Sequence, residues 1–134
     1  MAMQWNDSFL VHVSEVDTQH KKLVELVNSL EAAMRAGKGR EILGGILASL
    51  IQYTQYHFSA EERLMQAKKY PDYPKHLIEH QKLTHTVVEF KQQFDAGNKT
   101  LTIPTMEFLQ NWLVNHILHT DIVLGKYLSA QGVK

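Results

Sequence analysis

The chain contains no cysteine, no excess of charge of either sign and no hydrophobic run long enough to cross a membrane. The lack of cysteine excludes disulfides, thiolate metal sites and cysteine nucleophiles. The longest apolar stretch, residues 42–51, is too short and too interrupted to span a bilayer. The first residues also lack the basic and apolar regions of a signal peptide, so we expect a cytoplasmic protein with no membrane partner.

Charge and length narrow the class of protein further. Lysine plus arginine number 14 and aspartate plus glutamate number 14, which gives a formal net charge of zero. A neutral chain is a poor partner for nucleic acid or for an anionic membrane. The 134 residues suit a single domain that buries about two thirds of the surface of the unfolded chain. The unusual feature is the presence of eight histidines.

Apolar residues recur at helical spacing through most of the chain, after an N-terminal segment that has no such period. We expect residues 1–16 to form an extended arm anchored by Trp5 and Phe9, and Asp17 to cap the first helix. Clusters of glycine and proline separate the helical segments, which cover residues 17 to about 36, about 40–68, about 72–95 and about 102–130. Four long helices with short connections predict an all-α, up-down-up-down four-helix bundle.

Two polar residues interrupt the apolar face of the second expected helix. His57 and Glu61 lie four residues apart, so they share a face with Leu50 and Thr54. A histidine and a glutamate are costly to bury in an apolar stripe unless something binds them. A metal ion is the simplest partner, because neutral imidazole and carboxylate are both ligands. The alternatives are a hydrogen-bonded His–Glu pair in the core and a face that reaches solvent.

The other expected helices carry polar residues on their inward faces at the same level. In an up-down bundle, the start of one helix lies beside the end of the next, so these positions converge at one end of the bundle. Five imidazoles and two carboxylates exceed what one ion needs, and two first-row metal ions bridged by the carboxylates fit the count. The candidate ligands are His20, His57, Glu61, His76, His80, His116 and Asp121.

The last two candidate ligands pose a geometric problem. His116 and Asp121 are five residues apart, which is about 140° of rotation on an ideal α-helix. A π-type turn with about 4.4 residues per turn would reduce the separation to roughly 50°, and such bulges favour functional sites. The alternative is a regular helix from which Asp121 approaches the site from the flank.

Four segments that contain these candidates resemble the motifs of bacterial hemerythrins (bacteriohemerythrins). They are DTQHKKL at residues 17–23, HFSAEE at 57–62, HLIEH at 76–80 and HILHTD at 116–121. The resemblance extends over nearly the whole chain, including the Trp5-Asn6-Asp7 opening and the Tyr70-Pro71 loop. It implies a hemerythrin-like domain with two irons and an oxo or hydroxo bridge. One iron would be held by His76, His80 and His116, the other by His20 and His57, and Glu61 and Asp121 would bridge them.

By this count, the iron of His20 and His57 keeps one free octahedral position. The resemblance implies that dioxygen binds there reversibly, in an apolar pocket to which Leu118 contributes. A site rich in histidine and poor in carboxylate favours oxygen binding over oxygenase chemistry. We therefore expect a monomeric protein for oxygen storage, transport or delivery that is not an enzyme, with a protein that receives oxygen as a further candidate partner.

Two other functions stay open for the same site. One is an oxygen- or redox-sensing module, which the sequence favours less because no output domain accompanies the bundle. The other is a di-iron peroxidase or oxidase, or an enzyme that handles nitric oxide. A ferritin-like centre is disfavoured because no glutamate has a histidine three residues after it. The three remaining histidines, His12, His85 and His119, are expected to be structural or solvated, and His12 stands where hemerythrins usually have glycine.

Overall fold

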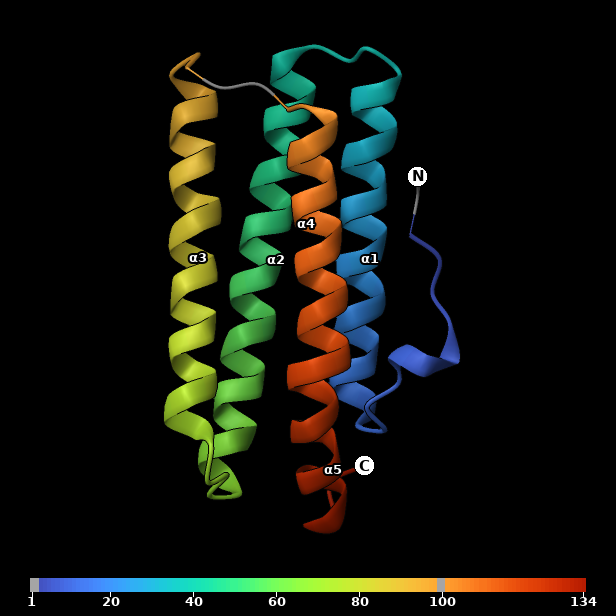
Figure 1. Ribbon diagram of the computed structural model, residues 1–134, viewed down its shortest axis with the longest axis vertical. Coiled ribbons are helices and arrows are strands. Elements are labelled where there is room, and N and C mark those ends of the chain that lie inside the picture. Colours follow the sequence, from blue (N-terminus) through green and yellow to red (C-terminus); the bar gives the residue numbers. More distant parts are fainter. Residues whose placement is uncertain (1–2, 99–100) are drawn as a thin grey trace.

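The computed structural model describes residues 3–98 and 101–134, and in these two ranges every regular element is helical. Three long helices, α1 (Ser14–Arg35), α2 (Arg40–Ala67) and α3 (Tyr73–Asp95), are followed by a fourth rod. This rod consists of α4 (Ile103–Asn115), the π-helical turn η2 (His116–Asp121) and α5 (Ile122–Ala130). The four rods alternate in direction and form a bundle, which confirms the predicted architecture (Figure 1). No helix among the residues described is long and apolar enough to cross a membrane.

The first helix ends at a sharp turn that contains Gly37, as the glycine cluster in the sequence predicts. Gly37 takes a φ of 72°, a left-handed conformation that glycine adopts at no steric cost. There the amide of Gly37 donates to the Met34 carbonyl, and the amide of Lys38 donates to the Ala33 carbonyl. These two bonds satisfy carbonyls that the helix end would otherwise leave without partners.

The start of the first helix differs from the prediction. α1 begins at Ser14, three residues before the expected cap, and Asp17 lies inside its first turn. The Asp17 carboxylate instead accepts hydrogen bonds from the backbone amides of Val11 (2.8 Å) and His12 (3.1 Å). The prediction that Asp17 caps this helix is therefore wrong: Val13 is the N-cap residue, and Asp17 binds amides of the preceding arm rather than those of its own helix.

The N-terminal arm lies beside α1 (Figure 1), and its residue Val11 lies tightly against α5. Phe9, one of the two predicted anchors, is buried in the core, and its ring lies 5.4 Å from that of Trp5. A β-carbon at Gly125 would overlap the backbone of Val11, so only glycine fits where the arm crosses α5. His12 has a φ of 67°, a left-handed conformation that is uncommon for residues other than glycine.

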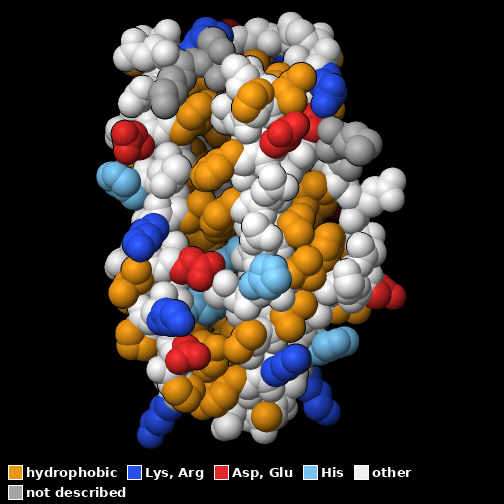
Figure 2. Space-filling model, in the orientation of Figure 1, with side chains coloured by type: hydrophobic (Ala, Val, Ile, Leu, Met, Phe, Trp, Pro, Cys, Tyr) orange, Lys and Arg blue, Asp and Glu red, His pale blue; other side chains and the backbone are white. Residues whose placement is uncertain are grey.

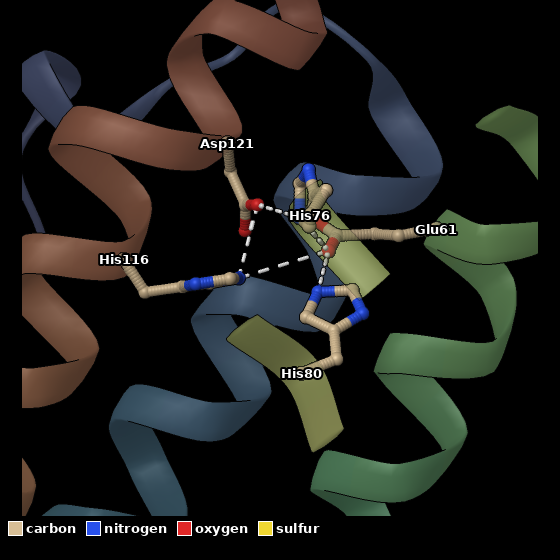
Figure 3. A group of neighbouring side chains, drawn as sticks. All are labelled: Glu61, His76, His80, His116 and Asp121. Carbon is tan, nitrogen blue, oxygen red and sulfur yellow. Dashed lines mark ion pairs between the residues drawn. The ribbon is translucent and has the colours of Figure 1, made fainter. Parts of the chain in front are cut away.

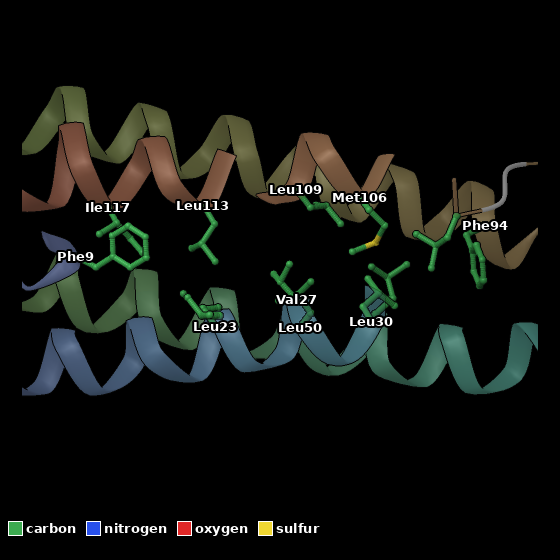
Figure 4. Close-up of a cluster of buried hydrophobic side chains, with 13 residues drawn as sticks. Phe9, Leu23, Val27, Leu30, Leu50, Phe94, Met106, Leu109, Leu113 and Ile117 are labelled. Atoms are coloured by element: carbon green, nitrogen blue, oxygen red, sulfur yellow. The ribbon is translucent and has the colours of Figure 1, made fainter. Parts of the chain in front are cut away.

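Two apolar clusters fill the core on either side of a polar layer. The larger runs along most of the bundle, as Figure 4 shows, and contains Leu30, Leu50, Phe94 and Met106 among its buried members. The smaller lies at the other end, beneath the arm and the α2–α3 connection, and consists of Val11, Val13, Val16, Met65, Tyr70, Leu124 and Leu128. On every helix, the candidate ligands fall between residues of these two clusters.

Candidate metal centre

All seven side chains singled out by the sequence meet inside the bundle. α1 supplies His20, α2 supplies His57 and Glu61, α3 supplies two histidines, and η2 begins and ends with the last two candidates. None is more than 4% exposed. Their nitrogen and oxygen atoms form two groups in which all atoms lie within 4.8 Å of one another. The first group, drawn in Figure 3, is Glu61, His76, His80, His116 and Asp121; the second is His20, His57, Glu61 and Asp121.

Glu61 belongs to both groups because its two oxygens face different histidines. Its Oε1 lies 3.0 Å from the Nε2 atom of His80 and 3.4 Å from that of His76. Its Oε2 lies 3.2 Å from the Nε2 atom of His57, one turn earlier on the same helix. The carboxylate therefore spans the boundary between the two groups of imidazoles.

The two oxygens of Asp121, which lies across the bundle from Glu61, also face different histidines. Its Oδ1 lies 3.0 Å from the Nε2 atom of His116 and 3.2 Å from that of His76. Its Oδ2 lies 2.7 Å from the Nε2 atom of His20. Two carboxylates thus lie between two sets of imidazoles, which are His76, His80 and His116 on one side and His20 and His57 on the other.

The π-helical turn explains how the fourth rod can present both of its candidates. The chain is π-helical from His116 to Asp121, so the bulge that the sequence left as one of two alternatives is confirmed. The extra residue brings Asp121 inward, where it is 1% exposed. Thr120, inside this turn, is half-buried, and its hydroxyl donates to Glu79.

The cluster leaves many buried polar atoms without a partner. Eight side-chain nitrogen and oxygen atoms here are buried and make no hydrogen bond, including both oxygens of Glu61 and the Nε2 atoms of four histidines. Buried polar atoms are normally paired, and each one left unpaired costs about 1–3 kcal/mol. All but one of these atoms belong to the Nε2 and carboxylate set that faces inward, so the donor set fits bound cations.

Three residues that the sequence did not single out bind the outer nitrogens of the histidines. The Nδ1 atom of His57 lies 2.7 Å from Oε1 of Gln19. The Nδ1 atoms of two further histidines face glutamates, His80 against Glu62 at 2.9 Å and His116 against Glu79 at 2.8 Å. Such partners fix the ring orientation and leave Nε2 as the inward donor atom. Each partner comes from a different helix than its histidine, so no spacing in the sequence could reveal the pairing.

The charges within the cluster stabilise imidazolium and carboxylate together. Burial lowers the pKa of His57 and of His76, but Glu61 and Asp121 outweigh this effect and raise both to about 9. Burial likewise opposes ionisation of Glu61, whose pKa the histidines nevertheless hold well below its usual value. The hydrogen bond from His116 lowers the pKa of Glu79 despite its burial. The site therefore favours cationic charge at its centre, from protons or from metal ions.

The remaining candidates lie outside the cluster. His12, His85 and His119 are exposed, as expected for structural or solvated histidines. Leu118 is half-buried and packs against the larger apolar cluster. Leu113 is 2% exposed and lies one turn before His116 on the wall of an interior cavity.

A four-helix bundle that encloses five histidines and two carboxylates is typical of metal-binding helix bundles. A family model described as the hemerythrin HHE cation binding domain matches residues 11–128. The chain therefore belongs to the hemerythrin family.

Individual relatives agree with this assignment. The chain is 38% identical over 129 residues to a bacteriohemerythrin of Methylococcus capsulatus (Bath), which covers 96% of this chain and 98% of that relative. It is 31% identical over 118 residues to a hemerythrin-like protein of Naegleria gruberi, covering 88% and 87% of the two chains. A crystal structure of wild-type hemerythrin matches with a TM-score of 0.88 at 36% identity, over 96% of this chain and 99% of that one.

Proposed function

We propose that this protein binds dioxygen reversibly at a non-heme di-iron centre and serves in oxygen storage, transport or delivery rather than as an enzyme. The observation that carries the proposal is the division of the two carboxylates. Glu61 and Asp121 each turn one oxygen to a set of three histidines and the other to a set of two. One cation needs only one such set, whereas two cations that share both carboxylates use every inward atom.

The residues have distinct parts in this proposal. His76, His80 and His116 would hold one iron, His20 and His57 would hold the other, and Glu61 and Asp121 would bridge them. A bound iron pair supplies the redox chemistry that takes up and releases dioxygen. The protein fixes the rings through Gln19, Glu62 and Glu79 and keeps bulk water out with the apolar clusters on both sides. His20 and His57 supply fewer metal ligands than the set of three histidines, so we place the oxygen-binding position on the iron that they would hold.

The experiment that tests the function is reversible oxygenation. Reduced, iron-loaded protein should gain visible absorption in air and lose it when oxygen is removed, through repeated cycles. Protein loaded with zinc is the control and should show no oxygen-dependent absorption, because zinc has no redox chemistry. An iron-loaded protein whose spectrum does not respond to oxygen would contradict the proposal, and turnover of peroxide would favour the peroxidase alternative.

Substitution of two leucines tests which of them lines the oxygen pocket. The sequence predicts that Leu118 guards the pocket, whereas the structure favours Leu113, which is buried one turn from His116. We expect Leu113→Ala to admit water and to speed autoxidation several-fold, with a full iron content. Leu118→Ala should speed autoxidation only if Leu118 lines the oxygen pocket, as the sequence predicts. The matched control is Leu43→Ala, at a half-buried leucine of the larger apolar cluster.

The cytoplasmic location, the monomeric state and a receiving protein stay predictions beside this function. We propose them as the simplest setting for a small oxygen carrier. Sedimentation equilibrium of the iron-loaded protein tests the monomeric state. A monomer should give a mass of 15.4 kDa, and a dimer would give about twice that mass.

A further inference from the structure

A small cavity lies in the core directly beside the cluster of candidate ligands. Its volume is about 20 Å³, and it is enclosed by all four helical rods. Four of its lining residues lie three positions from a histidine of the cluster on the same helix, which is one turn along the same face. These four residues are Leu23, Thr54, Leu83 and Leu113. The cavity therefore adjoins the layer of histidines over its whole width.

The lining of this cavity suits an apolar gas better than water. Apart from the hydroxyl of Thr54 and the indole of Trp112, its walls consist of aliphatic side chains. The Thr54 hydroxyl already donates to the Leu50 carbonyl at 2.7 Å. A buried water needs two to four polar partners, and apolar cavities that lack them stay dry while binding gases such as xenon. The volume is enough for about one small molecule.

A groove on the surface leads toward this cavity between α3 and α4. It has a volume of about 630 Å³, and its floor is apolar, with Phe90 and Phe108 among the lining residues. Figure 2 shows hydrophobic side chains within this hollow. Within the described ranges, α3 packs closely along α2 but makes few close approaches to α4. The seam between α3 and α4 is therefore the loosest side of the bundle beside the cavity.

Three residues line both the groove and the cavity, and they form the partition between the two. Leu47 and Leu109 are buried, at 1% and 7% exposure, and Val87 is half-buried. The groove and the cavity are therefore separated by a single layer of apolar side chains. Rotamer changes in such a layer occur on fast timescales and need no polar bond to break.

We propose that dioxygen enters through the groove between α3 and α4, passes the partition at Val87 and Leu109, and waits in the cavity beside the histidines. The proposal rests on the function proposed above and adds the path and the residues that control it. Water is disfavoured along this route because the partition and the cavity offer it too few partners. Val87 sets the rate of passage because it is the least buried member of the partition.

The test compares Val87→Phe with Val88→Phe in iron-loaded protein. Val88 is a half-buried valine at the next position of the same helix, but it lines a different, more polar groove between α2 and α3. Stopped-flow mixing with oxygen should show that Val87→Phe slows both association and release about tenfold. The ratio of the two rates should not change, since the partition belongs to neither end state. Val88→Phe should have wild-type rates, and Val87→Ala should speed both steps.

Xenon gives a second readout that does not depend on oxygen binding. In crystals under xenon pressure, we expect xenon in the cavity and on the groove floor over Val87, with the groove site lost in Val87→Phe. Equal rates for both phenylalanine variants, or xenon only in the groove that Val88 lines, would overturn the route. If the wild-type spectrum does not respond to oxygen at all, the proposed function fails, and the xenon positions still decide whether this route exists.

Discussion

The apolar half of the bundle and the polar half, which holds the histidine layer above the smaller apolar cluster, are built from the same helices but fill their cores differently. In the apolar half, on the side of the α1–α2 connection, Leu30, Leu47, Phe94 and Met106 pack with almost no exposure. In the polar half, five imidazoles and two carboxylates occupy the equivalent inward positions. Among the residues described, α1, α2 and α3 keep regular α-helical periodicity through both halves, whereas the fourth rod departs from it in the polar half with the π-helical turn that brings Asp121 inward.

The difference shows how each half acquires its stability. Burial of apolar surface contributes about 25 cal/mol per Å², so we expect the apolar half to be stable without a ligand. In the polar half, eight buried polar atoms make no hydrogen bond, so we expect cations that bind there to stabilise it. Changes in the two halves should for this reason affect different measurements.

The largest effect is expected from removal of a shared carboxylate. Glu61→Ala deletes the two oxygens that face both sets of histidines, so the iron content should fall from two per chain to one or none. Elemental analysis of folded protein gives the result. A variant that retains two irons would show that Glu61 does not bridge them.

A matched change in the apolar half should produce the opposite pattern. Met106→Ala opens a cavity at a residue that is 1% exposed and should lower the free energy of unfolding by about 2–5 kcal/mol. The iron content should stay at two per chain. Denaturant unfolding of the iron-loaded and the metal-free protein should give the same loss, and a loss of iron would show that the two halves are not independent.

In metal-free protein, the polar half should make the stability depend on pH. The pKa of His57 and that of His76 are raised to about 9, from an ordinary value of 6.5. The stability that these protons contribute is fully present below pH 6.5 and is lost as the pH rises through about 9. Thermal unfolding should therefore show a melting temperature that falls between these two pH values. Iron-loaded protein should lack this fall, since its histidines are held neutral as ligands.

A smaller effect is expected from an outer partner of the cluster. Glu79→Gln weakens the hydrogen bond that orients His116 and should reduce metal affinity by about 10–100-fold without loss of the fold. Competition with a chelator measures this affinity. Glu107→Gln, at an exposed glutamate of α4 on the rod that carries His116, is the control. Equal affinities in the two variants would mean that Glu79 does not support the site.

The sequence predicts the helices and the inward histidines well because both follow from local spacing. The limits of α2 and α3 agree with expectation to within a residue or so, since glycine and proline clusters define them. Spacing alone could not decide between a regular and a π-helical turn at His116, because both keep that residue buried. Spacing also could not reveal the role of Asp17, because its carboxylate accepts hydrogen bonds from amides of the preceding arm rather than from its own helix.

Contacts between helices were beyond the reach of the sequence. Gln19 adjoins His20 in the chain but binds His57, and Glu79 adjoins His80 but binds His116. The need for glycine at Gly125 likewise arises only where the arm crosses α5. In each case, the chemistry of a residue is determined by a partner that lies far away along the chain.

The most direct test of the account is an anaerobic titration of metal-free protein with iron(II), followed by measurement of the iron retained per folded chain. The two sets of histidines that share Glu61 and Asp121 predict saturation at two irons per chain, and a visible spectrum that then responds reversibly to oxygen. Saturation at one iron, or retention of zinc alone, would contradict the claim that the polar half of this bundle is a di-iron centre.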